Sequence, residues 1–170
     1  MWLAAWLGCA ATTAGPTSGD TGAPPVCPAG PGEGFSFEPA CVGDFCGGTV
    51  WPEARAQLGE PDACAADVGR VTCAWGPLSV TFPDCDRDGA PDEEALCDLY
   101  SQVLTLGQGF AGTDVDHGLG LGDDAACFAA ALGAPVSGGW NLGDNPWVRV
   151  TLEPAAGPVT AIHLDWSLDE

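Results

Sequence analysis

The sequence predicts an α+β fold in which two tandem helix-then-β-hairpin repeats form an antiparallel sheet, packed by two short helices and stabilised by disulfides. Three observations lead to this prediction. A helix pattern that ends in glycine occurs twice, at a spacing of 74 residues. Segments with alternating apolar residues follow each copy. The cysteines outside the extreme N-terminus are even in number. The two repeats span approximately residues 45–106 and 118–168.

Each predicted helix has a start signal, a stop signal and one apolar stripe. Thr49 and Asp123 carry side-chain oxygens that can accept hydrogen bonds from the free N–H groups of a first turn. Gly59 and Gly133 can adopt the left-handed conformation that ends a helix, and a proline follows two residues later. The stripes consist of Trp51, Ala54 and Leu58 in the first copy, and of Ala125, Phe128 and Leu132 in the second.

Strand segments follow each helix. Leu78, Val80 and Phe82 alternate with polar neighbours, which is typical of a strand with one buried face, and residues 148–152 show the same alternation. Residues 96–106 could be helical by propensity, and the duplication alone makes them a predicted strand. The predicted segments are 70–75, 77–82 and 96–106 in the first copy, and 139–140, 147–152 and 159–166 in the second.

The chain divides into three parts. Residues 1–9 form a short apolar segment that ends in a cysteine, and we interpret them as a lipoprotein signal remnant with its lipidation site. Residues 10–34 consist almost entirely of Gly, Pro, Ala, Ser and Thr, a composition that predicts an extended linker with little to bury. Residues 35–170 are long enough to hold one hydrophobic core.

The N-terminal segment ends in Trp6-Leu7-Gly8-Cys9, which resembles a bacterial lipobox. The resemblance implies lipidation of Cys9, a membrane anchor and an extracytoplasmic location, in the periplasm or on the cell surface. Trp6 and Leu7 depart from the residues usual in that motif, and no basic region precedes them. The alternative is an apolar tail with an unrelated cysteine.

The remaining eight cysteines fit four disulfides outside the cytosol. A zinc site is the competing interpretation, but close pairs of cysteines are missing and the chain has only two histidines. Local pairs such as Cys64 with Cys73, or Cys85 with Cys97, are plausible, and the pairing is otherwise open.

Charge and composition exclude several functions. The chain carries 24 acidic residues against 4 basic ones, so its formal net charge is -20. Such a surface repels phosphate, which argues against nucleic acid as a partner and limits membrane contact to the lipid anchor. A hydrophobic content of 46% is too high for a disordered acidic chain.

The tandem pattern of a cap, a short helix ending in Leu-Gly-x-Pro and tryptophan-bearing strands is similar to the β-lactamase inhibitory protein fold. It is also similar to the small lipoprotein subunit of the bacterial β-barrel assembly machine. The segment Gly118-Leu119-Gly120-Leu121-Gly122-Asp123 resembles the entry to the second helix in lipoproteins of this shape. The resemblance implies a binding or scaffold role and transfers no contact residue.

Residues 84–94 resemble a calcium loop of the EF-hand or thrombospondin-repeat type. Aspartates at loop positions 1, 3, 5 and 9, with glycine at position 6, can direct several hard oxygens at one ion. Position 12 is Ala95 in place of an acidic ligand, Arg87 adds a positive charge, and an acidic hairpin tip is the alternative. The predicted ligands are Asp84, Asp86, Asp88, the Ala90 carbonyl, Asp92 and either Glu93 or Glu94.

Catalytic patterns are weak. His163 and Asp165 would share a strand face, but a pair without a placed nucleophile is typical of a solvated surface. His117 could join Asp114 and Asp116 in a metal site, yet its glycine-rich surroundings favour simple exposure. Trp140 is either a core residue or an exposed contact residue.

We therefore expect no catalytic residues and no certain cofactor, Ca²⁺ being the one possible ion. The leading hypothesis is a non-enzymatic extracytoplasmic lipoprotein that binds a protein partner or stabilises an envelope assembly. The second is a calcium-dependent binding module, and the third is a hydrolase with an unrecognised site.

Overall fold

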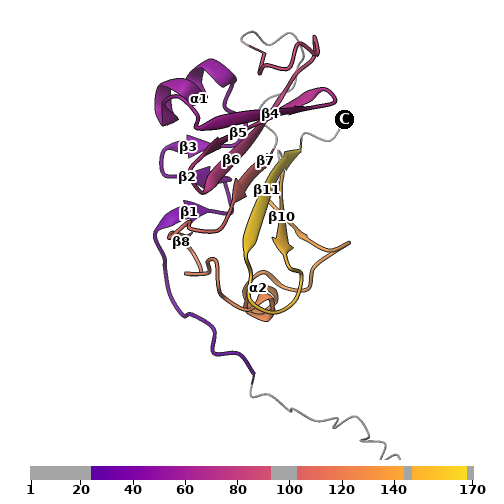
Figure 1. Cartoon of the computed structure of the whole chain (residues 1–170). Coiled ribbons are helices and arrows are strands. Elements are labelled where there is room, and N and C mark those ends of the chain that lie inside the picture. Colours follow the sequence, from indigo (N-terminus) through magenta and orange to yellow (C-terminus); the bar gives the residue numbers. More distant parts are fainter. Residues whose placement is uncertain (1–23, 93–102, 144–146, 168–170) are drawn as a thin grey trace, which may run out of the picture.

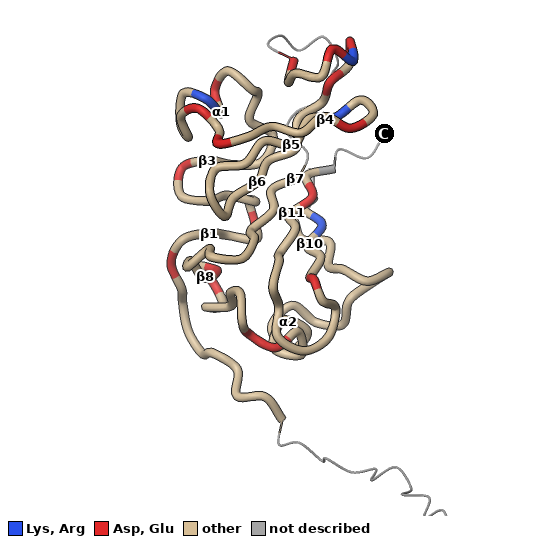
Figure 2. The backbone as a smooth tube through the Cα atoms, viewed as in Figure 1, with Lys and Arg blue, Asp and Glu red and all other residues tan. Residues whose placement is uncertain are grey.

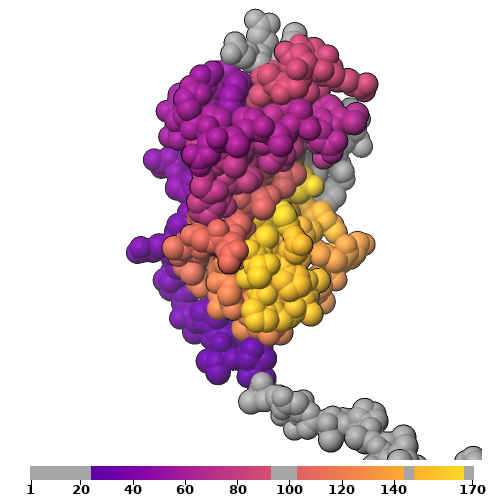
Figure 3. Space-filling view, viewed as in Figure 1, coloured from indigo at the N-terminus to yellow at the C-terminus, as the bar shows by residue number. Residues whose placement is uncertain are grey.

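A computed structural model describes residues 24–92, 103–143 and 147–167. These residues form one continuous, elongated body (Figure 3). Helices α1 (Trp51–Leu58) and α2 (Ala125–Leu132) lie near opposite ends of it (Figure 1). Figure 2 shows acidic positions along the whole body and few basic ones. No helix among the described residues is long and apolar enough to cross a membrane.

The larger of two sheets has seven strands in the order β4-β5-β6-β7-β11-β10-β9, and every neighbouring pair is antiparallel. Its strands are β4 (Ala63–Asp67), β5 (Arg70–Trp75), β6 (Leu78–Pro83), β7 (Val103–Leu106), β9 (Trp140–Leu142), β10 (Trp147–Glu153) and β11 (Ala161–Ser167). The predicted alternation is confirmed, since Leu78, Val80 and Phe82 are buried while Ser79 and Thr81 are only partly so.

The smaller sheet has four strands in the order β3-β2-β1-β8. Phe35 and Phe45 point into the core from β1 and β3, and the ring of Phe35 lies 5.2 Å from that of Phe37. A disulfide joins the directly opposed residues Cys41 and Cys46. The strands are β1 (Gly34–Ser36), β2 (Cys41–Val42), β3 (Phe45–Cys46) and β8 (Thr113–Asp114), of which β8 runs parallel to β1.

The predicted α+β class is wrong, because the described chain is mostly β, with eleven strands in two sheets and two helices of eight residues each. The helix-then-hairpin description omitted the four-stranded sheet and the edge strand β4 altogether. Strands of two or three residues are too short to show alternation. The sequence of β4, Ala-Cys-Ala-Ala-Asp, has low strand propensity.

Both predicted helices are present, and each starts one residue later than expected. Val50 precedes α1, with a proline in the first turn, and the hydroxyl of Thr49 instead donates to the Cys46 carbonyl. Asp124 caps α2 by accepting from the N–H of Ala126. Gly59 and Gly133 end the two helices as predicted, with a positive φ of 83° and 86°. Their ψ values of -166° and -172° are extended, so the conformation is not the left-handed one that was expected.

A tryptophan indole supports the end of each helix. Trp75 on β5 donates from Nε1 to the Gly59 carbonyl at 3.0 Å, and Trp140 on β9 donates to the Gly133 carbonyl at 2.7 Å. Trp140 is buried, so of its two interpretations the core one holds. These bonds satisfy carbonyls that a helix end leaves without partners.

The disulfides of the described chain join both neighbouring strands and distant segments. The predicted Cys64–Cys73 pair is confirmed and links β4 to β5. Cys27 pairs with Cys127 of α2 across 100 residues, so part of the predicted linker is fixed to the folded body. Cys85 is also disulfide-bonded, and its partner, predicted to be Cys97, lies outside the described residues.

Candidate metal-binding loop

The acidic loop follows β6 and lies against the turn that joins β4 to β5, at the end of the body near α1 (Figures 1 and 2). The N–H of Asp84 donates to the Gly69 carbonyl of that turn at 3.0 Å. Asp84 is one of two buried charged residues among those described, at 2% exposure. The loop therefore starts from a carboxylate held inside the fold.

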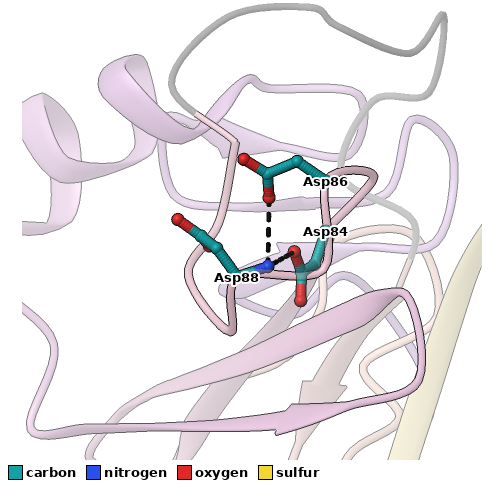
Figure 4. Close-up of side chains that lie close together, drawn as sticks. All are labelled: Asp84, Asp86 and Asp88. Carbon is teal, nitrogen blue, oxygen red and sulfur yellow. Dashed lines mark hydrogen bonds between the residues drawn. The ribbon is translucent and has the colours of Figure 1, made fainter.

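Three of the predicted ligands come together. Asp84, Asp86 and Asp88 each offer a carboxylate oxygen within 4.8 Å of the others (Figure 4). Carboxylate oxygens are the ligands that calcium prefers, and three of them supply part of the six to eight that it takes. Asp86 and Asp88 are exposed, so an ion could enter from solvent.

The same carboxylates also hold the turn in shape. Asp84 accepts from the N–H of Asp88 at 3.1 Å and from that of Gly89 at 3.2 Å. Asp86 accepts from the N–H of Asp88, and Asp88 from that of Ala90 at 2.8 Å. Side-chain to backbone bonds of this kind stabilise turns without an ion, so they support the acidic hairpin tip as well as the calcium loop.

The other predicted ligands lie apart from this group or outside the described residues. The carboxylate of Asp92 accepts from the N–H of Cys85 at 2.8 Å and is not one of the three grouped carboxylates. Ala90 contributes an N–H to the loop. Glu93 and Glu94 lie outside the described residues. Three carboxylates thus form the group that the structure brings together.

An open hollow of about 520 Å³ lies between this loop and the β4–β5 turn. Sequence reasoning did not place the turn here. The two-residue hairpin signal, Val68-Gly69 between two strands, is the pattern that could have revealed it. The residues that line the hollow are Ala66, Asp67, Val68, Gly69, Asp84, Arg87, Asp88 and Gly89.

The second predicted pair, His163 and Asp165, lies on β11 with side chains on the same sheet face. His163 Nδ1 is 3.0 Å from the hydroxyl of Thr105, and Nε2 is 3.6 Å from a carboxylate oxygen of Glu153. A hydroxyl, an imidazole and a carboxylate in this sequence of contacts, here Thr105, His163 and Glu153, resemble a catalytic nucleophile with its general base and the group that orients the base. However, β7 and β11 lie in the middle of the sheet, where ladder bonds use the backbone N–H groups that an oxyanion would need.

His117 is partly buried beside one aspartate, in place of the simple exposure that the sequence favoured. Its Nδ1 is 2.7 Å from the carboxylate of Asp114, which is fully buried. That carboxylate also accepts from the N–H groups of Phe37, Asp116 and His117. Asp114 is therefore a structural acceptor that joins the N-terminal segment to the turn after β8, a role the sequence did not reveal.

Comparison of the chain with protein-family models, with curated proteins and with solved structures finds no match. The resemblance to the β-lactamase inhibitory protein and to the small assembly-machine lipoprotein therefore stays a prediction.

Proposed function

We propose that this protein is a non-enzymatic extracytoplasmic lipoprotein whose folded domain binds a protein partner or serves as a scaffold in the cell envelope. The observation that carries the proposal is the outer face of the seven-stranded sheet. None of the described side chains on this face is buried, although the opposite face forms the core. Proteins recognise partners through such accessible, rigid surfaces.

The outer face carries mostly short side chains, and the long ones in its two central rows are Arg149 and His163. Strand register aligns one row across six strands: Thr72, Thr81, Val103, Asp165, Arg149 and Asn141. The next row contains Ala74, Ser79, Thr105, His163 and Thr151. A partner can approach this backbone closely because few long side chains stand above it.

A photo-crosslinking residue in place of Thr81 tests this surface in intact cells. Thr81 lies on central strand β6 on the outer face, whereas Glu53 lies exposed on α1 and serves as the matched control position. We expect a discrete crosslinked product from position 81 and none from position 53, identified by mass spectrometry. Equal products at both positions, or none at either, would contradict a binding role for this face.

The anchor gives a second expected result. Because multiple acyl chains hold a lipoprotein in a membrane, the full chain should partition into the detergent phase when expressed from its native start. Cys9→Ser removes the acceptor thiol and should shift the protein to the aqueous phase, as scored by immunoblot after phase separation. If the wild-type protein were found in the aqueous phase, the proposed lipid anchor at Cys9 would be wrong.

A calcium-dependent binding module is the second candidate function. The convergence of Asp84, Asp86 and Asp88 favours it. Bound calcium would neutralise their mutual repulsion and fix the loop. With three grouped carboxylates, affinity should fall in the weak extracellular class, a Kd of about 10⁻⁴ to 10⁻³ M.

Calorimetric titration of calcium into the oxidised protein measures this affinity. The double variant Asp86→Ala, Asp88→Ala should lose the binding heat, since it removes two of the three carboxylates. Glu53→Ala, which removes an exposed carboxylate on α1, is the matched control and should bind like the wild type. The same heat from all three proteins, or none from the wild type at millimolar calcium, would leave the loop as an acidic hairpin tip.

A further inference from the structure

We propose that the free edge of β4 binds an extended peptide segment as an added strand, and that a Lys or Arg of that segment enters the acidic hollow beside Ala66. The inference rests on the proposed binding function and names a second surface for it. It also names the chemistry of the partner: a cationic segment in extended conformation.

Strand β4 is an edge of the seven-stranded sheet among the described residues. It pairs with β5 on one side, no described strand lies on the other, and all five of its residues are exposed. Sheet edges are usually protected by lysine, proline or a bulge. Ala63–Ala66 carries neither a charge nor a proline, so the segment itself lacks two of these protective features.

The backbone groups that point outward can be identified. Cys64 and Cys73 are directly opposed with a Cα–Cα distance of 4.1 Å, which is the close spacing of a non-hydrogen-bonded antiparallel pair. Their neighbours Ala63 and Ala65 therefore bond to β5. The N–H and C=O groups of Cys64 and Ala66 point away from the sheet and are available to an added strand.

The Cys64–Cys73 disulfide makes this edge a suitable docking site. An isolated edge strand of five residues would fray, and a partner would have to order it on binding. The disulfide fixes β4 in register with β5 before any partner arrives. The entropic cost of adding a strand is lower as a result.

The hollow lies at the end of this edge. A Cβ on Gly89 of the acidic loop would be 3.7 Å from the Cβ of Ala66, so the hollow lies on the face to which the Ala66 side chain points. Directly opposed residues on paired strands project to the same face. The peptide residue opposite Ala66 would therefore direct its side chain into the hollow.

Charge selects a cationic side chain at that position. Asp67, Asp84 and Asp88 line the hollow against Arg87 alone, and the whole chain carries a formal charge of -20. A second copy of the chain is disfavoured as the occupant, because it would place two acidic hollows and two strongly acidic bodies together. A basic segment is attracted both by the acidic hollow and by the net negative charge of the whole chain.

The probe is an acetylated, amidated heptapeptide, Thr-Val-Thr-Arg-Thr-Val-Thr, titrated into the full-length oxidised protein without calcium and followed by amide NMR shifts. We expect the N–H groups of Cys64 and Ala66 to shift and to gain protection from hydrogen exchange. A peptide with Glu in place of Arg should bind at least tenfold more weakly. Binding should also weaken as salt rises.

Two variants test separately how the backbone edge of β4 and the acidic residues of the hollow contribute to peptide binding. Ala66→Pro removes an outward N–H while leaving the bonds to β5, and it should weaken binding at least tenfold. The double variant Asp67→Asn, Asp88→Asn keeps the side-chain acceptors for Val68 and Ala90 but removes two charges. It should reduce the preference for Arg over Glu at least fivefold, and it tests the proposal even where Ala66→Pro fails to fold.

Four outcomes would overturn the proposal: no binding at millimolar peptide, equal binding of the Glu peptide, unchanged binding by Ala66→Pro, or a homodimer that Ala66→Pro dissociates. Crosslinking at Thr81 is independent of this edge. A partner captured there despite a failed peptide titration would overturn the β4 inference and leave the proposed function intact.

Discussion

Replacing Cys27 and Cys127 together by alanine should lower the free energy of unfolding by about 4–5 kcal/mol. The disulfide closes a loop of 100 residues, and its largest effect is to restrict the unfolded chain. Loop-closure entropy for that length corresponds to about 4.7 kcal/mol at 25 °C. The disulfide also fixes the segment before β1 to α2, so its loss should release that segment to solvent. Urea denaturation at equilibrium measures the change.

The Cys41–Cys46 disulfide is the matched control. It joins residues only five apart, for which the same relation gives about 2 kcal/mol. Cys41 and Cys127 are both buried, so the loss of packing by alanine substitution is similar in the two double variants. Equal destabilisation of both, or a loss under 1 kcal/mol for the long loop, would show that chain entropy is not the main contribution.

The segments that sequence reasoning predicted best are those with a strong local signal. The strand predicted at 70–75 has those bounds in the structure, and the glycine stops at Gly59 and Gly133 end the two helices. Alternation of apolar and polar residues is visible in β5, β6 and β10 because each of these strands has six or seven residues and one face in the core. The helix starts were one residue early because Thr49 and Asp123 bond to other backbone groups.

The fold class could not be predicted because it depends on short strands with long-range partners. Residues 34–46 contain three strands of two or three residues, and β8, which pairs with β1, lies about 80 positions away. No local period identifies such pairing. The Cys27–Cys127 disulfide is equally non-local, since eight cysteines allow 105 pairings. Among the described disulfides, the one that was predicted is the local pair Cys64–Cys73, whose residues are nine positions apart.

The candidate site was predicted in part for a similar reason. Asp84, Asp86 and Asp88 are close in the sequence, and a tight turn brings their carboxylates together. Asp92 lies four residues beyond them and is bonded instead to the N–H of Cys85, which a loop template does not foresee. Asp67 lines the same hollow from another hairpin, so only tertiary structure could add it.

Asp114→Ala should lower the free energy of unfolding by about 4 kcal/mol. The carboxylate is fully buried, and it accepts from the N–H groups of Phe37, Asp116 and His117 and from His117 Nδ1. Hydrogen bonds to a charged acceptor contribute about 1.5–3 kcal/mol each, and a buried donor left without a partner costs about 1–3 kcal/mol. Phe37 is itself buried, so water cannot replace the lost acceptor for its N–H.

Two further variants show whether the buried carboxylate is the cause. Asp116→Ala removes an exposed side chain of the same turn and should change stability by less than about 0.5 kcal/mol. His117→Ala removes one half-exposed donor and should cost about 1 kcal/mol, since the three backbone bonds to Asp114 remain. The urea midpoint should therefore fall most for Asp114→Ala, less for His117→Ala and least for Asp116→Ala. If Asp114→Ala proved no more destabilising than Asp116→Ala, Asp114 would not be the acceptor that joins the N-terminal segment to the turn after β8.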